Sequence, residues 1–196
     1  MIYTASLTRT TLRLRETRII ADMLLQNTDS STWKDALYTQ NVLQMKSVKT
    51  IQDVSLVLKA RLETMTAPLW QMVRDGTQDQ ATQATLAASI KHSRLLGDFM
   101  DITIREQRAL FAKHLEPRLW LDYIAGCRGR DPDMPLWSDA TIAKLRSSAF
   151  SMLAEAGYFK DTRSLVMQNV FVDSELASYL TDRGEAYVLR CLEVTE

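Results

Sequence analysis

Residues 137–157, WSDATIAKLRSSAFSMLAEAG, have the pattern of one amphipathic helix. Ser138 can cap the first turn, and Gly157 can end the last one. Apolar side chains recur on one face at helical spacing, at Ile142, Leu145, Ala149, Met152 and Leu153. Small and polar side chains occupy the opposite face, at Ala140, Lys144, Ser147, Ser148 and Ser151. The pattern therefore predicts a long helix over residues 139–156 with one buried face and one hydroxyl-rich face.

The segments on either side of this helix predict the rest of the C-terminal part. A helix is expected over residues 117–125, ending at Gly126, and the glycine- and proline-containing residues 127–136 predict a loop. Residues 158–172 predict two short strands joined by a turn at residues 161–164. This order of helix, loop, longer helix and ribbon is typical of a winged helix-turn-helix. The alternative is an ordinary helical subdomain with a hairpin.

Helical periodicity also dominates the N-terminal part. Helices are expected over residues 7–26, around Trp33 with Ser30 or Ser31 as the cap, from Ser47 to Met65, from Pro68 to Asp75, over residues 79–95 and from Gly97 to Phe111. We therefore predict an all-α protein in two parts. The first is a helical bundle (residues 1–126), and the second is a winged-helix-like subdomain (residues 127–196) that carries a short β-ribbon and packs on the bundle.

Charge and composition limit the function. The 24 basic and 24 acidic residues give a net charge of zero, which disfavours a protein that is cationic over its whole surface. Residues 1–120 hold 16 basic and 12 acidic residues, whereas residues 121–196 hold 8 and 12, so an anion-binding surface is expected in the N-terminal part. No run of about 18 apolar residues could span a bilayer. The lone Cys127 and Cys191 fit a cytoplasmic protein with reduced thiols.

No motif for catalysis or metal binding is present in the sequence. His92 and His114 lie far apart, with no cysteine or acid at ligand spacing around them. The glycine-rich motifs of nucleotide-binding proteins and the GxSxG motif of hydrolases are missing. We therefore expect a non-enzymatic protein without a cofactor or a metal ion.

Two groups of side chains are candidates for binding nucleic acid. The first group consists of Arg9, Arg13, Arg15 and Arg18 in the first predicted helix, with Lys46 and Lys49 around the start of the Ser47-capped helix. If these elements pack side by side, they form a surface for phosphate groups. The alternative is that the arginines pair with acids elsewhere in the bundle.

The second group lies on the helix over residues 139–156 and on the predicted ribbon. It consists of Lys144, Ser147 and Ser151 on the helix, with Lys160 and Arg163 on the ribbon. Small residues allow a helix to approach DNA closely, and hydroxyls can bond to phosphates or base edges. The alternative is an ordinary solvated helix face. Because only charged contacts release counterions, we expect the first group to contribute more to DNA affinity than the second.

Glu16 projects from the apolar side of the first predicted helix. A carboxylate in that position must be paired or protonated, because burying an isolated charge is costly. Arg61, at the edge of another apolar face, is the expected partner. We interpret Glu16 as half of a structural ion pair and not as a catalytic acid.

A set of landmarks in a fixed order extends over nearly the whole chain. The landmarks are Leu12, Glu16, Thr17 and Arg18; Asn41, Val42, Leu43 and Gln44; Ser47; Arg61 and Leu62; Leu69 and Trp70; Trp137 and Ser138; and residues 153–157, LAEAG. As an ordered set they resemble the BrxA family, the small protein of BREX bacteriophage-resistance systems. The resemblance implies a bundle like that of the antitermination factor NusB, and a role in phage defence. Family members have been labelled inner-membrane proteins, which this sequence does not support.

Together these observations predict a non-enzymatic protein that binds double-stranded DNA with weak sequence specificity in phage defence. The competing interpretation is an adaptor that docks other BREX proteins. Double-stranded DNA and other BREX proteins are thus the expected partners, with a homo-oligomer as a further option and no membrane.

Overall fold

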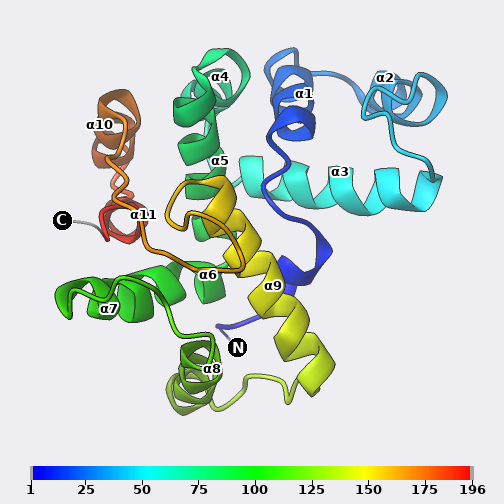
Figure 1. Cartoon of the computed structure of the whole chain (residues 1–196). Coiled ribbons are helices and arrows are strands. Elements are labelled where there is room, and N and C mark those ends of the chain that lie inside the picture. The colour runs from blue at the N-terminus through cyan, green and yellow to red at the C-terminus, as the bar shows by residue number, and fades with distance from the viewer. Residues whose placement is uncertain (1, 195–196) are drawn as a thin grey trace.

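The computed structural model describes residues 2–194, except for the side chains of Thr8 and Arg9, and the protein is predominantly helical (Figure 1). In chain order the elements are η1 (Ser6–Arg9), α1 (Leu14–Leu25), α2 (Ser30–Lys34), η2 (Asp35–Thr39), α3 (Val48–Leu62), α4 (Ala67–Asp75), α5 (Gln78–His92), α6 (Arg94–Asp98), η3 (Phe99–Ile104), α7 (Arg105–Ala109), α8 (Leu119–Arg130), α9 (Asp139–Glu155), α10 (Ser174–Asp182) and α11 (Ala186–Leu192). This confirms the all-α class. None of the helices found between residues 2 and 194 is long and apolar enough to cross a membrane.

Helix α5 is the centre of the protein. Helices α1, α3 and α4 from the N-terminal part of the chain pack against it, and α10 and α11 from the C-terminal part also pack against it (Figure 1). Every residue from 81 to 90 is buried, which explains why this segment lacks a polar face. Its hydroxyl groups bond to carbonyls one turn earlier, as Thr85 does to Ala81 and Ser89 to Thr85, both at 2.8 Å. Polar side chains are therefore tolerated in the middle of the core.

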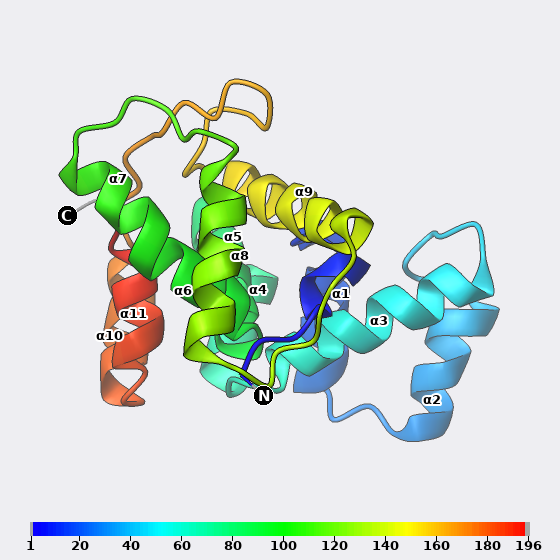
Figure 2. The same ribbon diagram turned by 90° about the horizontal axis from the view of Figure 1, so that it is seen from below.

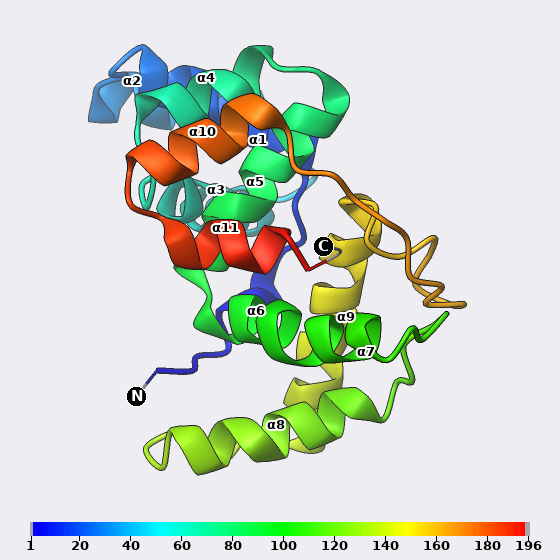
Figure 3. The same cartoon turned by 90° about the vertical axis from the view of Figure 1, so that its left-hand side faces the viewer.

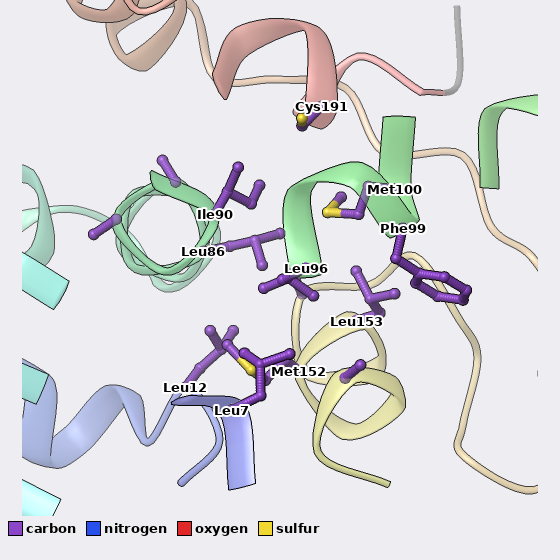
Figure 4. Close-up of a cluster of buried hydrophobic side chains, with 14 of the residues drawn as sticks. Leu7, Leu12, Leu86, Ile90, Leu96, Phe99, Met100, Met152, Leu153 and Cys191 are labelled. Atoms are coloured by element: carbon purple, nitrogen blue, oxygen red, sulfur yellow. The ribbon is translucent and has the colours of Figure 1, made fainter. Parts of the chain in front are cut away.

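One hydrophobic core runs from the N-terminal to the C-terminal segments. The close-up in Figure 4 labels Leu7 of η1, Leu12, Leu86 and Ile90 of α5, Leu96 of α6, Phe99 and Met100 of η3, Met152 and Leu153 of α9, and Cys191 of α11. Seen from the side, α11 lies between α10 and α6 (Figure 3). The division into residues 1–126 and 127–196 remains a prediction, and its boundary falls inside α8.

The first predicted helix, over residues 7–26, is wrong in its first half. After the short η1 the chain is not helical until α1 begins at Leu14. The buried Arg61 explains this break, because its guanidinium donates to the carbonyls of Thr11 at 2.7 Å and Thr10 at 2.9 Å. Those two carbonyls are therefore bonded across the fold instead of within a helix.

The predicted Glu16–Arg61 pair is also wrong. Glu16 is partly buried, and its carboxylate lies 3.5 Å from the guanidinium of Arg13, one helical turn earlier. The Arg61 guanidinium instead donates to the Thr10 and Thr11 carbonyls, and it interacts electrostatically with the Glu155 carboxylate.

Three expected helix boundaries also move. Helix α8 continues through Gly126 to Arg130, because Cys127 is buried and the Arg130 guanidinium donates to the Tyr3 hydroxyl at 3.0 Å. Those contacts outweigh a cost of about 1 kcal/mol for a glycine inside a helix. The break after α5 falls at Ser93 instead of Gly97. The cap of α2 is Asp29 instead of Ser30 or Ser31.

The expected β-ribbon is reduced to isolated contacts. Within residues 2–194 the extended segments form two single bridges, His114 with Val166 and Phe159 with Met167. Residues 165–167 are shared between two neighbours, which are residues 158–160 on one side and residues 113–115 on the other. Because neither pairing extends further, a regular two-stranded ladder does not form.

Candidate nucleic-acid interface

A pocket lies between α9 and the turn at residues 161–164. Its volume is about 270 Å³, and we call it the α9 pocket. It is lined by Arg146, Ser147, Phe150 and Ser151 of α9, by Thr162, Arg163 and Leu165 of the turn, and by Pro117. The fold therefore brings Ser147, Ser151 and Arg163, three residues that the sequence indicated, to one place.

Local interactions fix both walls of this pocket. The Ser138 hydroxyl accepts a bond from the amide of Thr141 at the start of α9, as predicted. The Asp161 carboxylate accepts bonds from the amides of Arg163 at 2.8 Å and Ser164 at 2.7 Å, which closes the turn. The Ser164 and Arg163 donors hold the pKa of the Asp161 carboxyl below its usual range. This carboxylate is therefore occupied by the backbone of its own turn.

The cations around the α9 pocket have no ion-pair partner among the described residues. Arg163, Lys144 and Lys160 are exposed, Arg146 is half-buried, and none of the four has an ion pair within 4.0 Å in the described part of the chain. The hydroxyl of Ser147 donates to the Ala143 carbonyl at 3.0 Å, which leaves its oxygen able to accept a bond. The pocket therefore combines guanidinium groups with small hydroxylated side chains.

Arg146 is the residue that the sequence analysis missed. It lies between the apolar stripe and the serine face of α9, and it was assigned to neither. The signal was present, because Arg146 directly precedes Ser147 on the helix. Its place in the pocket depends on the turn around Thr162, which no helical pattern reveals.

Two of the N-terminal candidates, Arg18 and Arg13, bond to other residues of the bundle. The guanidinium of Arg18 donates to the carbonyls of Arg74 at 2.6 Å and Gly76 at 2.9 Å, where α4 ends. It thus satisfies carbonyls that the end of a helix leaves open. Arg13 faces Glu16, whereas Arg15 is exposed with no ion pair to a described residue. The side chain of Arg9 lies outside the described residues.

The two halves of the N-terminal group do not meet. Lys46 and Lys49 are exposed around Ser47, which caps α3 as predicted. The segment before α1 contacts Arg61 near the opposite end of α3. The two ends of α3 are about 20 Å apart, and Figure 2 shows the start of α3 beside α2, away from α1. The side-by-side packing required for one phosphate-binding surface is therefore not present.

Metal-binding residues do not gather anywhere in residues 2–194. No group of three histidine, cysteine, aspartate or glutamate side chains there could hold a metal ion. Cys127 and Cys191 are buried free thiols, and burial raises the pKa of each.

Comparisons with known proteins show that the chain is similar to one family over most of its length. The BrxA family model matches residues 1–184. A protein named "BREX protein BrxA" from Paramagnetospirillum magneticum is 42% identical over 193 residues, which cover 98% of this chain and 97% of the relative. A protein of the same name from Escherichia coli O9:H4 is 28% identical over 179 residues, covering 91% of this chain and 84% of the relative.

A solved structure has the same fold. It is described as the crystal structure of an uncharacterized protein from Magnetospirillum magneticum. Its TM-score is 0.91 at 42% sequence identity, and the match covers 99% of this chain and 100% of that chain.

Proposed function

The chain belongs to the BrxA family, and from this premise we propose that it is a non-enzymatic protein of BREX phage defence that binds double-stranded DNA through the α9 pocket. The observation that carries the proposal is the meeting of Arg146 and Arg163 beside Ser147 and Ser151. Guanidinium groups bind phosphate oxygens with two parallel hydrogen bonds, and serine hydroxyls bond to phosphates or base edges.

Helix α9 has the dimensions and surface for this role. Its 17 residues give a length of about 25 Å. The exposed side carries Lys144 and Ser147, without a large apolar side chain between them. A helix with such a surface fits the major groove, which is about 12 Å wide.

The neighbouring elements support a winged-helix-like arrangement. Helix α8, the loop after it and α9 follow one another as in a helix-turn-helix, and the turn at residues 161–164 lies where a wing would follow. Arg163 on this turn and Lys160 directly before it would contact backbone phosphates. Likeness of the bundle to NusB is part of the same proposal and rests on the family resemblance.

Phosphate contacts would supply most of the affinity, so binding should depend strongly on salt and weakly on sequence. The test is fluorescence anisotropy with two unrelated duplexes at low and high salt, comparing the wild type with the Arg146→Ala/Arg163→Ala variant. We expect the wild type to bind both duplexes at low salt and the variant to bind both more weakly. A matched control is Lys34→Ala/Arg183→Ala, which removes two exposed cations outside the pocket. Equal loss in both variants would reject the α9 pocket as the site.

A second candidate function is that of an adaptor between BREX proteins, and one observation favours it. Val48 and Leu56 of α3 expose 62% and 57% of their surfaces, and Tyr38 of η2 exposes 40%. Exposed apolar residues of this size are typical of contacts between proteins. The same surface could join two copies of this chain. Light scattering of the purified protein, with Val48→Ser/Leu56→Ser as the variant, tests the second option.

A further inference from the structure

A second pocket lies beside the paired segments at residues 113–115 and 165–167. Its volume is about 650 Å³, and we call it the Phe111 pocket. Its lining includes Arg105, Arg108, Phe111, Lys113, Met167 and Val194. The amide of Met167 donates to the Lys113 carbonyl at 2.9 Å, and the amide of Leu115 donates to the Leu165 carbonyl at 3.0 Å. Because Leu165 lines the α9 pocket and Met167 lines the Phe111 pocket, the two pockets are neighbours.

The packing of this chain does not explain why an aromatic residue stands at position 111. Its side chain is 91% exposed, and its φ of 55° lies in the left-handed region. The residue follows the end of α7, where the amide of Ala112 returns to the Gln107 carbonyl at 3.0 Å. Glycine is the favoured residue at such a helix end, and a bulky side chain there strains the backbone. The chain thus holds an aromatic ring in solvent, in an unfavourable backbone conformation, beside a pocket.

Two cations of this pocket, Arg108 and Lys113, have no ion pair with a described residue. Among the described residues, the guanidinium of Arg108 donates to two neutral oxygens, the Asn169 side-chain oxygen at 3.0 Å and the Gln168 carbonyl. Its Nε is buried without an acceptor. Lys113 is exposed and has no ion pair with any described residue, whereas Arg105 is paired with Asp101.

An exposed aromatic ring next to two cations that have no ion pair with a described residue matches the chemistry of an unstacked nucleotide. Bases stack on aromatic side chains while lysine and arginine hold the backbone phosphates. A volume of about 650 Å³ lies within the range of small-ligand sites, roughly 300–1,000 Å³. The position beside the α9 pocket would place this nucleotide within the same DNA molecule.

We propose that the Phe111 pocket binds an unpaired nucleotide of DNA, with the ring of Phe111 stacked on the base and Lys113 and Arg108 facing its phosphates. This proposal rests on the proposed function, because a duplex held at the α9 pocket brings the nucleotide to the second pocket. The protein should then prefer duplexes interrupted by unpaired bases over continuous duplexes.

The test is fluorescence anisotropy with a continuous duplex and with the same duplex carrying three unpaired thymines. Stacking on one base corresponds to a preference of roughly 5- to 150-fold. We expect the wild type to show this preference, and Phe111→Ala to lose it while binding the continuous duplex normally. The matched control is Phe171→Ala, which removes another ring that is 77% exposed and lies outside the pocket. This control should keep the wild-type preference.

The outcomes separate this proposal from the proposed function. Equal wild-type affinity for both DNAs overturns the Phe111 pocket and leaves duplex binding intact. A preference that survives Phe111→Ala also overturns the Phe111 pocket as the nucleotide site. The exposed ring would then be a contact for a protein partner. Binding of the interrupted DNA alone, lost in Phe111→Ala, supports the pocket and rejects duplex binding at α9. Absence of binding to either DNA overturns both.

Discussion

Replacing Arg61 with methionine tests how the N-terminal segment is held. The Arg61 side chain is 2% exposed, and its guanidinium is the donor for the Thr10 and Thr11 carbonyls. Methionine keeps the apolar stem and removes both hydrogen bonds. Because residues 10–13 are not helical, no amide of a helix can replace the guanidinium as the donor to these carbonyls.

The structure sets the size of the effect. A buried carbonyl left without a donor costs about 1–3 kcal/mol, so two of them cost about 2–6 kcal/mol. The Thr11 carbonyl is partly open to water, and burial of the guanidinium is itself unfavourable, since it lowers the pKa of Arg61 to about 10. Both effects favour the lower half of that range. We expect Arg61→Met to lower the free energy of unfolding by about 3 kcal/mol, which corresponds to about 6–12 °C in Tm.

Thermal melts and urea titrations followed by circular dichroism measure this loss. The control is Arg15→Met, because Arg15 is exposed and has no ion pair with a described residue. Its effect should stay below about 0.5 kcal/mol. Amide hydrogen exchange at Leu12, whose amide bonds to the Glu155 carboxylate at 3.1 Å, should also accelerate in Arg61→Met. If Arg61→Met melts like Arg15→Met, the two carbonyls do not depend on Arg61 and the reasoning is refuted.

Three further predictions concern the core, a helix cap and alkaline pH. Gly97→Ala should cost about 1–3 kcal/mol in urea titrations, because a Cβ there meets Ile90 at 3.0 Å and the Tyr187 hydroxyl; unchanged stability would contradict the close packing. Ser138→Ala should cost about 1 kcal/mol through loss of the α9 cap, and equal melts would show that the cap is unimportant. Burial raises the pKa of Tyr3 from 10.0 to about 12, so the folded state keeps a proton that the unfolded state releases. Stability that is present below pH 10 should be lost as the pH rises to about 12, and the Tyr3→Phe variant should lose less of it over this range; an equal loss in that variant would refute this.

Local patterns predicted the elements whose signals lie within one turn or one helix. The helix expected over residues 139–156 is present as α9, with Ser138 as its cap. Ser47 likewise caps α3. In both, the hydroxyl bonds to an amide three residues later, so cap and periodicity agree within a few residues.

Bonds between distant residues account for what the sequence did not reveal. Arg61 bonds to carbonyls about fifty residues earlier, so the chain there is not helical. A helical wheel cannot show this bond, because it compares only residues of one helix. Arg18 reaches the end of α4 in the same way, so a residue expected to bind phosphate has a structural role. The α9 pocket combines a predicted helix with the turn around Thr162, and the relative position of those two elements depends on the whole core.

The salt dependence of DNA affinity tests the central claim most directly. The logarithm of the binding constant for one duplex is plotted against the logarithm of salt concentration. The plot is made for the wild type, for Arg146→Ala/Arg163→Ala and for Lys46→Ala/Lys49→Ala. If two phosphate contacts are lost, the slope should become less negative by about 2. We predict this change for Arg146→Ala/Arg163→Ala and a wild-type slope for Lys46→Ala/Lys49→Ala. The reverse result, a flatter slope only for the lysine variant, would contradict the α9 pocket as the site of DNA binding.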